Sequence, residues 1–156
     1  METFHQLNYA RTSTIIGLSN IDESFWDEQP DGYPNTVRWN AGHVFVTAEV
    51  FLNKADKTYE IAHPDWVSFF IDGTRPSEWN ETPPSKDAII AALKEQEERI
   101  VNHFNGKLKK KADEVQTFHA LSLDTAEAAL QFLAKARRKS VTFGMIEMPV
   151  IPAEPR

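Results

Sequence analysis

Trp39 and His43 are the residues whose types and spacing first indicate chemistry in this chain. They lie four positions apart at the start of an apolar run, residues 44–52, that contains no glycine or proline. On a helix this spacing places both side chains on one face, and Val46 and Val50 continue the same stripe. A histidine in such a stripe either hydrogen-bonds to a core partner or offers a neutral imidazole nitrogen to a metal ion. One histidine cannot make a metal site, so other residues must supply partners.

The other histidines do not supply an obvious second ligand. His5 lies near the expected start of the first helix and His119 precedes the expected last helix, while His63 and His103 fall elsewhere. None of them forms a pair spaced four residues apart, which is the spacing that puts two imidazoles on one helix face. We therefore interpret these four as lone surface or loop histidines. The sequence also shows no glycine-rich phosphate loop and no persuasive Ser-His-Asp arrangement.

Composition favours a single domain and excludes several classes of function. The chain has 156 residues, no cysteine and a formal net charge of −6. Without cysteine there are no disulfides, thiolate metal sites or cysteine nucleophiles, and this suits a reducing compartment. The acidic charge opposes binding to nucleic acid or an anionic membrane, and the sequence has neither a signal-peptide pattern at its start nor a window of about 18 apolar residues. We expect one cytoplasmic domain over residues 1–156.

Four segments show the apolar periodicity of amphipathic helices. The expected helices cover residues 3–20, 36–55, 85–104 and 124–143. Ser85 is the expected N-cap of the third helix, and Asp124 or Thr125 that of the fourth, with Glu127 placed as in a capping box. No segment shows a convincing strand pattern. The predicted fold is therefore all-α, a four-helix bundle with one long crossover between helices 2 and 3.

The crossover itself, residues 56–84, is unusually long for a connection within one domain. It contains several prolines but also Trp66, Phe69, Phe70 and Trp79. A disordered linker would be poor in aromatic residues. We therefore expect the segment to pack across the helices.

Three stretches of the sequence resemble the DinB-like superfamily, a group of small bacterial damage-inducible proteins. They are Pro34–His43, with its tryptophan and histidine four apart; Gly73–Trp79; and the helix Thr125–Leu133, which leads towards Phe143-Gly144-Met145-Ile146. The resemblance covers nearly the whole chain. It implies a four-helix bundle, often a homodimer, that holds a divalent metal such as zinc or nickel with three histidines.

In this family, one metal ligand comes from the second helix and two from a His-Glu-x-x-His arrangement on the fourth. His43 matches the first ligand. Alignment on Phe143-Gly144 places Arg138 and Thr142 at the other two ligand positions, with Lys139 in place of the acidic residue. Arginine cannot lose its proton to bind a metal. The resemblance therefore predicts a degenerate metal site in which only His43 is retained.

Two hypotheses about function follow from the resemblance. The first is a metal-dependent hydrolase or a transferase of low-molecular-weight thiols, in which metal-bound water or thiol is the nucleophile and the other ligands and catalytic residues are unknown. The second is a non-catalytic member that binds a small molecule or a partner chain.

The basic cluster at residues 135–139 is also open to two interpretations. It is either a solvated face near a helix C-terminus, or Arg138 fills the emptied site and holds an anion or carboxylate there. A short frameshift in the gene would produce the same pattern, and the neighbouring reading frames of the nucleotide sequence would reveal it.

Overall fold

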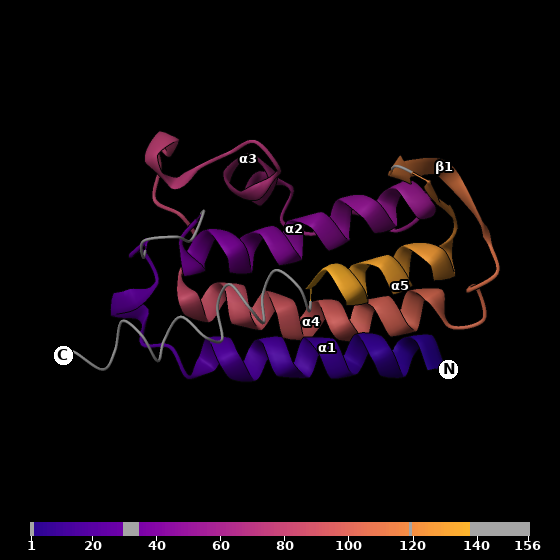
Figure 1. Cartoon of the computed structure of the whole chain (residues 1–156), viewed down its shortest axis with the longest axis horizontal. Helices are drawn as coiled ribbons and strands as arrows, with labels where there is room; N and C mark the ends of the chain where they lie inside the picture. The colour runs from indigo at the N-terminus through magenta and orange to yellow at the C-terminus, as the bar shows by residue number, and fades with distance from the viewer. Residues whose placement is uncertain (1, 30–34, 119, 138–156) are drawn as a thin grey trace.

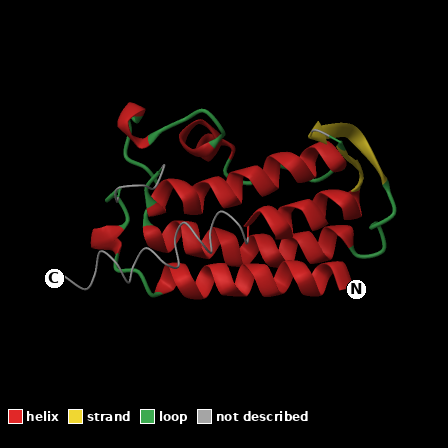
Figure 2. Cartoon of the chain, in the orientation of Figure 1, coloured by secondary structure: helices red, strands yellow, loops and turns green. Residues whose placement is uncertain are grey.

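The computed structural model describes residues 2–29, 35–118 and 120–137. Four long helices lie side by side in it: α1 (Glu2–Ser19), α2 (Val37–Ala55), α4 (Lys86–Phe104) and α5 (Ala126–Arg137) (Figure 1). Helices α1 and α2 each contact both α4 and α5. The prediction of a mostly helical chain is confirmed (Figure 2). The predicted continuation of the last helix to Phe143 lies outside the described residues.

Hydroxyl side chains cap three of these helices at their N-terminal ends. Each accepts a hydrogen bond from the backbone N–H three residues further on: Thr36 from Trp39 at 3.1 Å, Ser85 from Ala88 at 3.1 Å, and Thr125 from Ala128 at 3.0 Å. Ser85 and Thr125 are thus confirmed as caps. Glu127 does not close a capping box, because its carboxylate accepts from the Thr3 hydroxyl at 2.7 Å and from Lys109 at 2.8 Å. These two bonds tie the start of α5 to α1 and to the loop after α4.

The connection between α2 and α4 packs across α2, as its aromatic residues predict. It contains the short helices η2 (Pro64–Trp66), α3 (Val67–Phe70) and η3 (Pro76–Glu78). Trp66 and Phe70 are buried in a cluster with the first half of α2. The segment therefore covers α2 and leaves α4 and α5 to pack on its other side.

A β-hairpin between α4 and α5 corrects the all-α prediction. Strand β1 (Lys111–Phe118) pairs antiparallel with β2 (Leu121–Thr125). Among the described residues of both strands, Leu123 is the single buried side chain. Strands are recognised in a sequence by alternation of apolar and polar residues. Strand β2 alternates only over Leu121-Ser122-Leu123-Asp124, and β1 does not alternate, so the pattern is too short to identify the hairpin.

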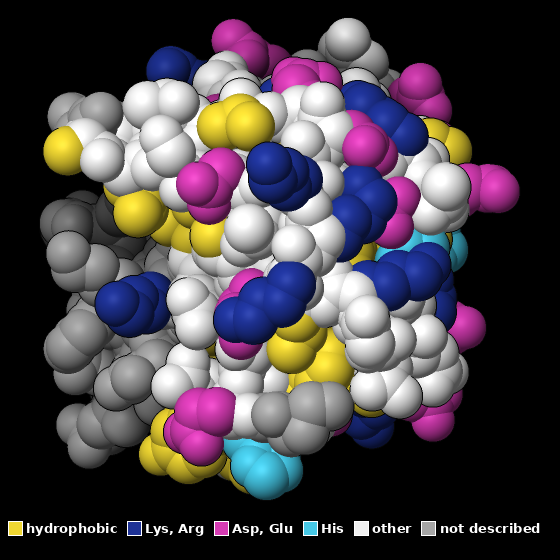
Figure 3. Space-filling model, turned by 90° about the vertical axis from the view of Figure 1, so that its right-hand side faces the viewer, with side chains coloured by type: hydrophobic (Ala, Val, Ile, Leu, Met, Phe, Trp, Pro, Cys, Tyr) yellow, Lys and Arg dark blue, Asp and Glu magenta, His cyan; other side chains and the backbone are white. Residues whose placement is uncertain are grey.

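The hairpin closes one end of the molecule. Phe118 stacks on Phe132 of α5 and on Phe51 of α2, with ring centroids 5.2 and 5.7 Å apart. Figure 3 looks at this end and shows Lys and Arg side chains mixed with Asp and Glu. Lys110, for example, pairs with Asp113 at 2.9 Å. The lysines that follow α4 therefore do not form a surface of one charge.

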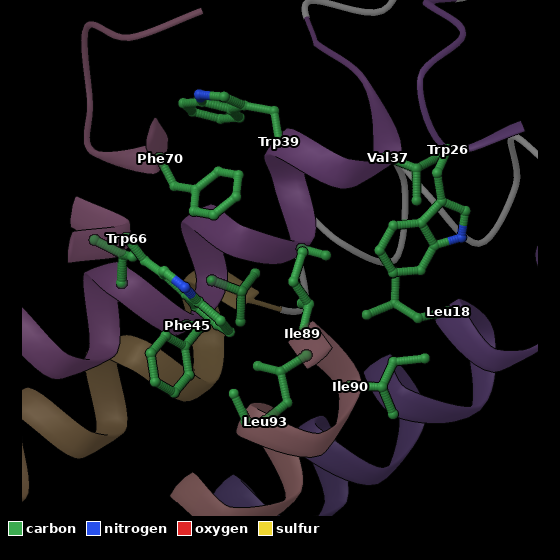
Figure 4. Close-up of a cluster of buried hydrophobic side chains, with 14 of the residues drawn as sticks. Leu18, Trp26, Val37, Trp39, Phe45, Trp66, Phe70, Ile89, Ile90 and Leu93 are labelled. Atoms are coloured by element: carbon green, nitrogen blue, oxygen red, sulfur yellow. The ribbon is translucent and has the colours of Figure 1, made fainter. Parts of the chain in front are cut away.

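The core consists of two apolar clusters arranged along α2. The first contains Trp39 and Phe45 of α2 together with Phe70 and Leu93 (Figure 4). The second surrounds the other half of α2 and includes residues of α1, α4 and α5. Glu49, fully buried, lies on α2 between the two. Within the described residues, no helix has the length and apolar character needed to cross a membrane.

Candidate functional site

His43 lies in the second turn of α2, and its neighbours hold the imidazole in one orientation. The ring stacks on the Trp39 indole, with centroids 4.4 Å apart and planes 13° from parallel. Its Nδ1 is 2.8 Å from the backbone oxygen of Phe70. A carbonyl oxygen only accepts hydrogen bonds, so Nδ1 carries the proton and donates it. In the neutral ring, the lone pair is therefore on Nε2.

Gly42 allows Phe70 to come close enough to α2 to make this contact. A Cβ atom built on Gly42 would lie 2.4 to 2.5 Å from atoms of the Phe70 ring. Such distances are well inside van der Waals contact, so any larger residue would displace the ring. Figure 4 shows Phe70 seated against this part of α2, next to Trp39. The glycine before the histidine thus positions α3 and, with it, the oxygen that fixes the His43 ring.

The second ring nitrogen of His43, Nε2, lies near a carboxylate and a hydroxyl. It is 3.4 Å from Oδ1 of Asp72, whose side chain is 90% exposed, and 3.4 Å from the Thr47 hydroxyl oxygen. A carboxylate cannot donate a hydrogen bond, so the contact with Asp72 is favourable only when His43 is protonated. When His43 is neutral, Nε2 can accept a hydrogen bond from Thr47 or bind a proton or a metal ion. This arrangement, with Nδ1–H bound to a backbone carbonyl, is typical of histidines that act as metal ligands.

A polar cavity of about 620 Å³ lies beside this histidine. Its lining residues are Gln29, Asn35, Trp39, Asp72, Gly73, Thr74, Arg75, Pro76 and Ser77. The indole Nε1 of Trp39 donates to the Thr74 hydroxyl at 2.9 Å, which fixes the loop after α3 over α2. Arg75 is exposed and has no ion-pair partner among the described residues. The cavity thus offers an indole wall and an available guanidinium.

The structure separates His43 from the other histidines. His103 is on α4, near the C-terminal end of α2, and its Nε2 is 3.0 Å from the carboxylate of Asp56. His63 is exposed and stacks on Trp66, with centroids 4.0 Å apart. His5 is exposed on α1, and His119 lies outside the described residues. His5 and His63 are thus exposed, as interpreted from the sequence, whereas His103 is a half-buried residue of α4 that bonds to Asp56.

Arg138 and Thr142, which the resemblance assigns to the other two ligand positions, lie outside the described residues, as does Lys139. Within the described part of the chain, no group of three His, Cys, Asp or Glu residues is placed to hold a metal ion. The sequence prediction also missed Asp72 and Arg75. The Gly73–Trp79 stretch carries part of the family resemblance, but nothing in it signals that its loop folds back onto Trp39.

A sequence model of the DinB superfamily matches residues 6–136. The chain belongs to the DinB superfamily. This match takes in α1, α2, the crossover, α4, the hairpin and nearly all of α5, so it confirms the resemblance drawn from the motifs. No curated protein matches the chain. The DinB match ends at residue 136, so it does not test the assignment of Arg138 and Thr142 to ligand positions.

Among the described residues of this DinB chain, His43 has geometry suited to a metal ligand, and Asp72 could add one oxygen near it. The resemblance assigns the other two ligand positions to a guanidinium and a hydroxyl, those of Arg138 and Thr142, which would not fit a three-imidazole centre. A guanidinium has no lone pair to donate and repels a cation.

Proposed function

We propose that this chain is a DinB-family protein of the four-helix-bundle type whose three-histidine metal centre is degenerate, and that it binds a small anionic molecule in the Trp39 cavity. The observation that carries the proposal is the position of His43. Its imidazole is fixed by Phe70, and its Nε2 is 3.4 Å from Asp72, which lines a polar cavity together with Trp39 and Arg75.

The lining of the cavity supports an anionic ligand. Arg75 presents a planar guanidinium that suits a carboxylate or phosphate group. The flat indole of Trp39 supplies an apolar wall next to it. Pockets for small molecules commonly combine an aromatic wall with a few polar groups that fix the ligand's orientation. Asp72 also lines the cavity, and protonated His43, 3.4 Å away, would offset its negative charge.

Thermal unfolding in the presence of citrate and of inorganic phosphate tests this function. The melting temperature should rise with anion concentration, because a ligand that binds only the folded state stabilises it. Arg75→Gln should abolish the rise. Lys94→Gln removes an exposed cation from α4 and should leave it unchanged. An equal response in the parent and the Arg75 variant, or no response to either anion, would rule out the proposed site.

The geometry of His43 also favours a second candidate, a metal-dependent hydrolase or thiol transferase that recruits further ligands. Elemental analysis after dialysis separates the two. The degenerate site predicts well under one divalent ion per chain, because a single histidine with water realises little of the coordination energy. Near-stoichiometric zinc or nickel would favour the metal-dependent enzyme.

Rebuilding the lost ligands tests the alignment directly. The double variant Arg138→His and Thr142→His would restore two imidazoles four residues apart, which share one face of a helix. Added zinc should then raise the melting temperature of this variant and affect the parent little. If the variant folds but gains no response to zinc over the parent, the assignment of the two ligand positions is wrong.

A further inference from the structure

Two residues of opposite charge line the Trp39 cavity without pairing with each other. Asp72 and Arg75 are three positions apart in the loop after α3, and both side chains are exposed. Within the described residues, no ion pair joins the two or connects Arg75 to another carboxylate. Asp72 contacts His43 at 3.4 Å, and that histidine offsets its charge only when protonated. One cavity therefore presents an available cation and an available anion.

Hydrogen bonds that involve neither charge hold this loop on α2. The Thr74 N–H donates to the Ile71 oxygen at 3.1 Å and closes a tight turn, in which Gly73 has a φ of +93°. Glycine adopts such a positive φ without strain. The Thr74 hydroxyl accepts from the Trp39 indole at 2.9 Å, and Arg75 has an extended backbone directly after the turn. The backbone thus fixes where the two charged side chains start, before any ligand arrives.

Asp72 and His43 together offer acceptors of hydrogen bonds. Oδ1 of Asp72 is 3.4 Å from Nε2 of His43. Because Nδ1–H of His43 donates to the Phe70 oxygen, the neutral ring carries its lone pair on Nε2. A ligand group placed beside both atoms has to donate hydrogen bonds to them, and the carboxylate favours a positive charge on that group. A primary ammonium, with one positive charge and three N–H donors, meets both requirements.

Arg75 has the complementary role. Its guanidinium only donates hydrogen bonds, and its planar shape suits a carboxylate. The Trp39 indole supplies an apolar wall for the carbon chain of a ligand. We propose that the ligand of this cavity is a zwitterion, whose carboxylate pairs with Arg75 and whose primary ammonium binds Asp72 and His43. This inference rests on the proposed anion site and adds the second charged group of the ligand.

Opposite charges in one cavity also discriminate against other ligands. Glutarate, a dicarboxylate, would place a negative charge beside Asp72, and butylammonium would bring a cation towards Arg75 and leave it without a partner. A molecule with both groups satisfies both charges at once. The separation of the two side chains sets the spacing of the two groups in the ligand, so a series of ω-amino acids of increasing length is the suitable probe.

Thermal unfolding of the full chain with such a series tests the inference. The series runs from glycine through 4-aminobutanoate to 6-aminohexanoate, at constant ionic strength and after removal of metal ions with a chelating resin. Each amino acid is compared with the carboxylate of the same carbon number, and the dependence of the melting temperature on concentration gives each dissociation constant. At least one amino acid should bind about three times as tightly as its matched carboxylate, or more. The gain is modest because Asp72 is exposed to solvent.

Two changes of Asp72 assign this preference to its charge. Asp72→Asn should remove the preference and leave butanoate binding intact. Asp65→Asn alters an exposed carboxyl of η2 in the same crossover and should retain the preference. Asp72→Lys should reverse the order, so that glutarate binds more tightly than 4-aminobutanoate. A reversed order cannot arise from loss of folding, because an unfolded variant would bind neither.

The outcomes separate this inference from the anion site on which it rests. If no amino acid binds more tightly than its matched carboxylate, or if Asp72→Asn keeps the preference, the ammonium subsite is wrong. A rise in melting temperature with citrate or phosphate that Arg75→Gln abolishes would then still support the anion site. No response of the parent chain to any anion or amino acid would overturn both.

Discussion

Trp39 connects the core to the loop that lines the cavity. Its side chain is 7% exposed, stacks on His43 and donates to Thr74. Trp39→Ala should lower the free energy of unfolding by about 3–5 kcal/mol, because it leaves a large void in a packed cluster. Trp39→Phe keeps most of the packing and loses one hydrogen bond, so it should cost only about 1 kcal/mol. Urea unfolding measures both, and equal effects of the two variants would contradict this division of roles.

Gly42 allows a second test of the packing around this histidine. Gly42→Ala would place a methyl group inside the Phe70 ring position and should destabilise the protein by about 1–3 kcal/mol, although alanine favours a helix more than glycine does. Urea unfolding measures this loss. Phe70→Leu replaces the ring with a smaller side chain and so makes room for the added methyl group. In a chain that already carries Phe70→Leu, Gly42→Ala should therefore cost less stability than it does in the parent. Additive losses in the double variant would show that the two residues do not compete for space.

The sequence predicted the face of α2 that carries the site but not the partners of His43. The four-residue spacing of Trp39 and His43 places them on one side of any helix, and the structure stacks the two rings. Phe70, at the end of α3, and Asp72, just after it, reach His43 from almost thirty residues along the chain, and their position depends on how α3 packs on Gly42. No local pattern specifies that docking.

At the scale of elements, the long helices and two of their caps were predictable because their signals are local. Amphipathic periodicity and a capping hydroxyl are properties of a few neighbouring residues, as Ser85 and Thr125 illustrate. The hairpin was missed for the opposite reason. Its strands are held by pairing with each other and by the stacking of Phe118 on two helices, and those contacts join residues distant in sequence.

Asp56 ties the C-terminal end of α2 to that of α4, and its ionisation predicts how stability depends on pH. Burial raises the pKa of this carboxyl, but hydrogen bonds from the Thr58 hydroxyl, the Thr58 N–H and His103 outweigh it and lower the pKa from 3.8 to about 2. A carboxyl with a lowered pKa in the folded state stabilises that state above its unfolded pKa. This contribution, about 2 kcal/mol, should disappear as the pH falls from about 4 to 2.

Urea unfolding at a series of pH values measures this loss. Asp56→Asn should be less stable than the parent at neutral pH and should show a shallower decline over the same acid range, because the titrating group is gone. Glu95→Gln, an exposed carboxyl on α4, provides the control and should follow the parent curve. A decline in Asp56→Asn as steep as that of the parent would assign the acid sensitivity to other carboxyl groups.

At the scale of the whole molecule, a buried polar network crosses the core between the two apolar clusters. At its centre, the Glu49 carboxylate accepts hydrogen bonds from Tyr59 at 2.6 Å, Gln96 at 2.8 Å and Arg99 at 3.0 Å. Gln96 also accepts from Arg11, which reaches across from α1. Burial lowers the pKa of Arg11 to about 10, so this side chain remains charged at neutral pH. The network thus joins α1, α2, α4 and the crossover around one buried carboxylate.

Glu49→Gln should therefore destabilise the whole fold rather than one element. The change removes the negative charge that pairs with Arg99 at 3.0 Å and turns an amide N–H₂ toward existing donors. Removing one partner of a buried ion pair costs about 3–5 kcal/mol, because the remaining charge is left without compensation. The urea midpoint should fall accordingly, with the same midpoint by circular dichroism and tryptophan fluorescence, since the network touches both clusters.

A double-mutant cycle with Arg99 separates the charge pair from general damage to the core. Arg99→Gln alone leaves Glu49 with its other donors, and Glu49→Gln alone leaves Arg99 facing an amide. If the two groups stabilise each other directly, the double variant should lose less than the sum of the single losses by at least about 1 kcal/mol. Glu95→Gln should stay within about 0.5 kcal/mol of the parent, as expected for an exposed carboxylate. Strict additivity of the Glu49 and Arg99 losses would show that their salt bridge at 3.0 Å contributes nothing beyond each residue's own packing.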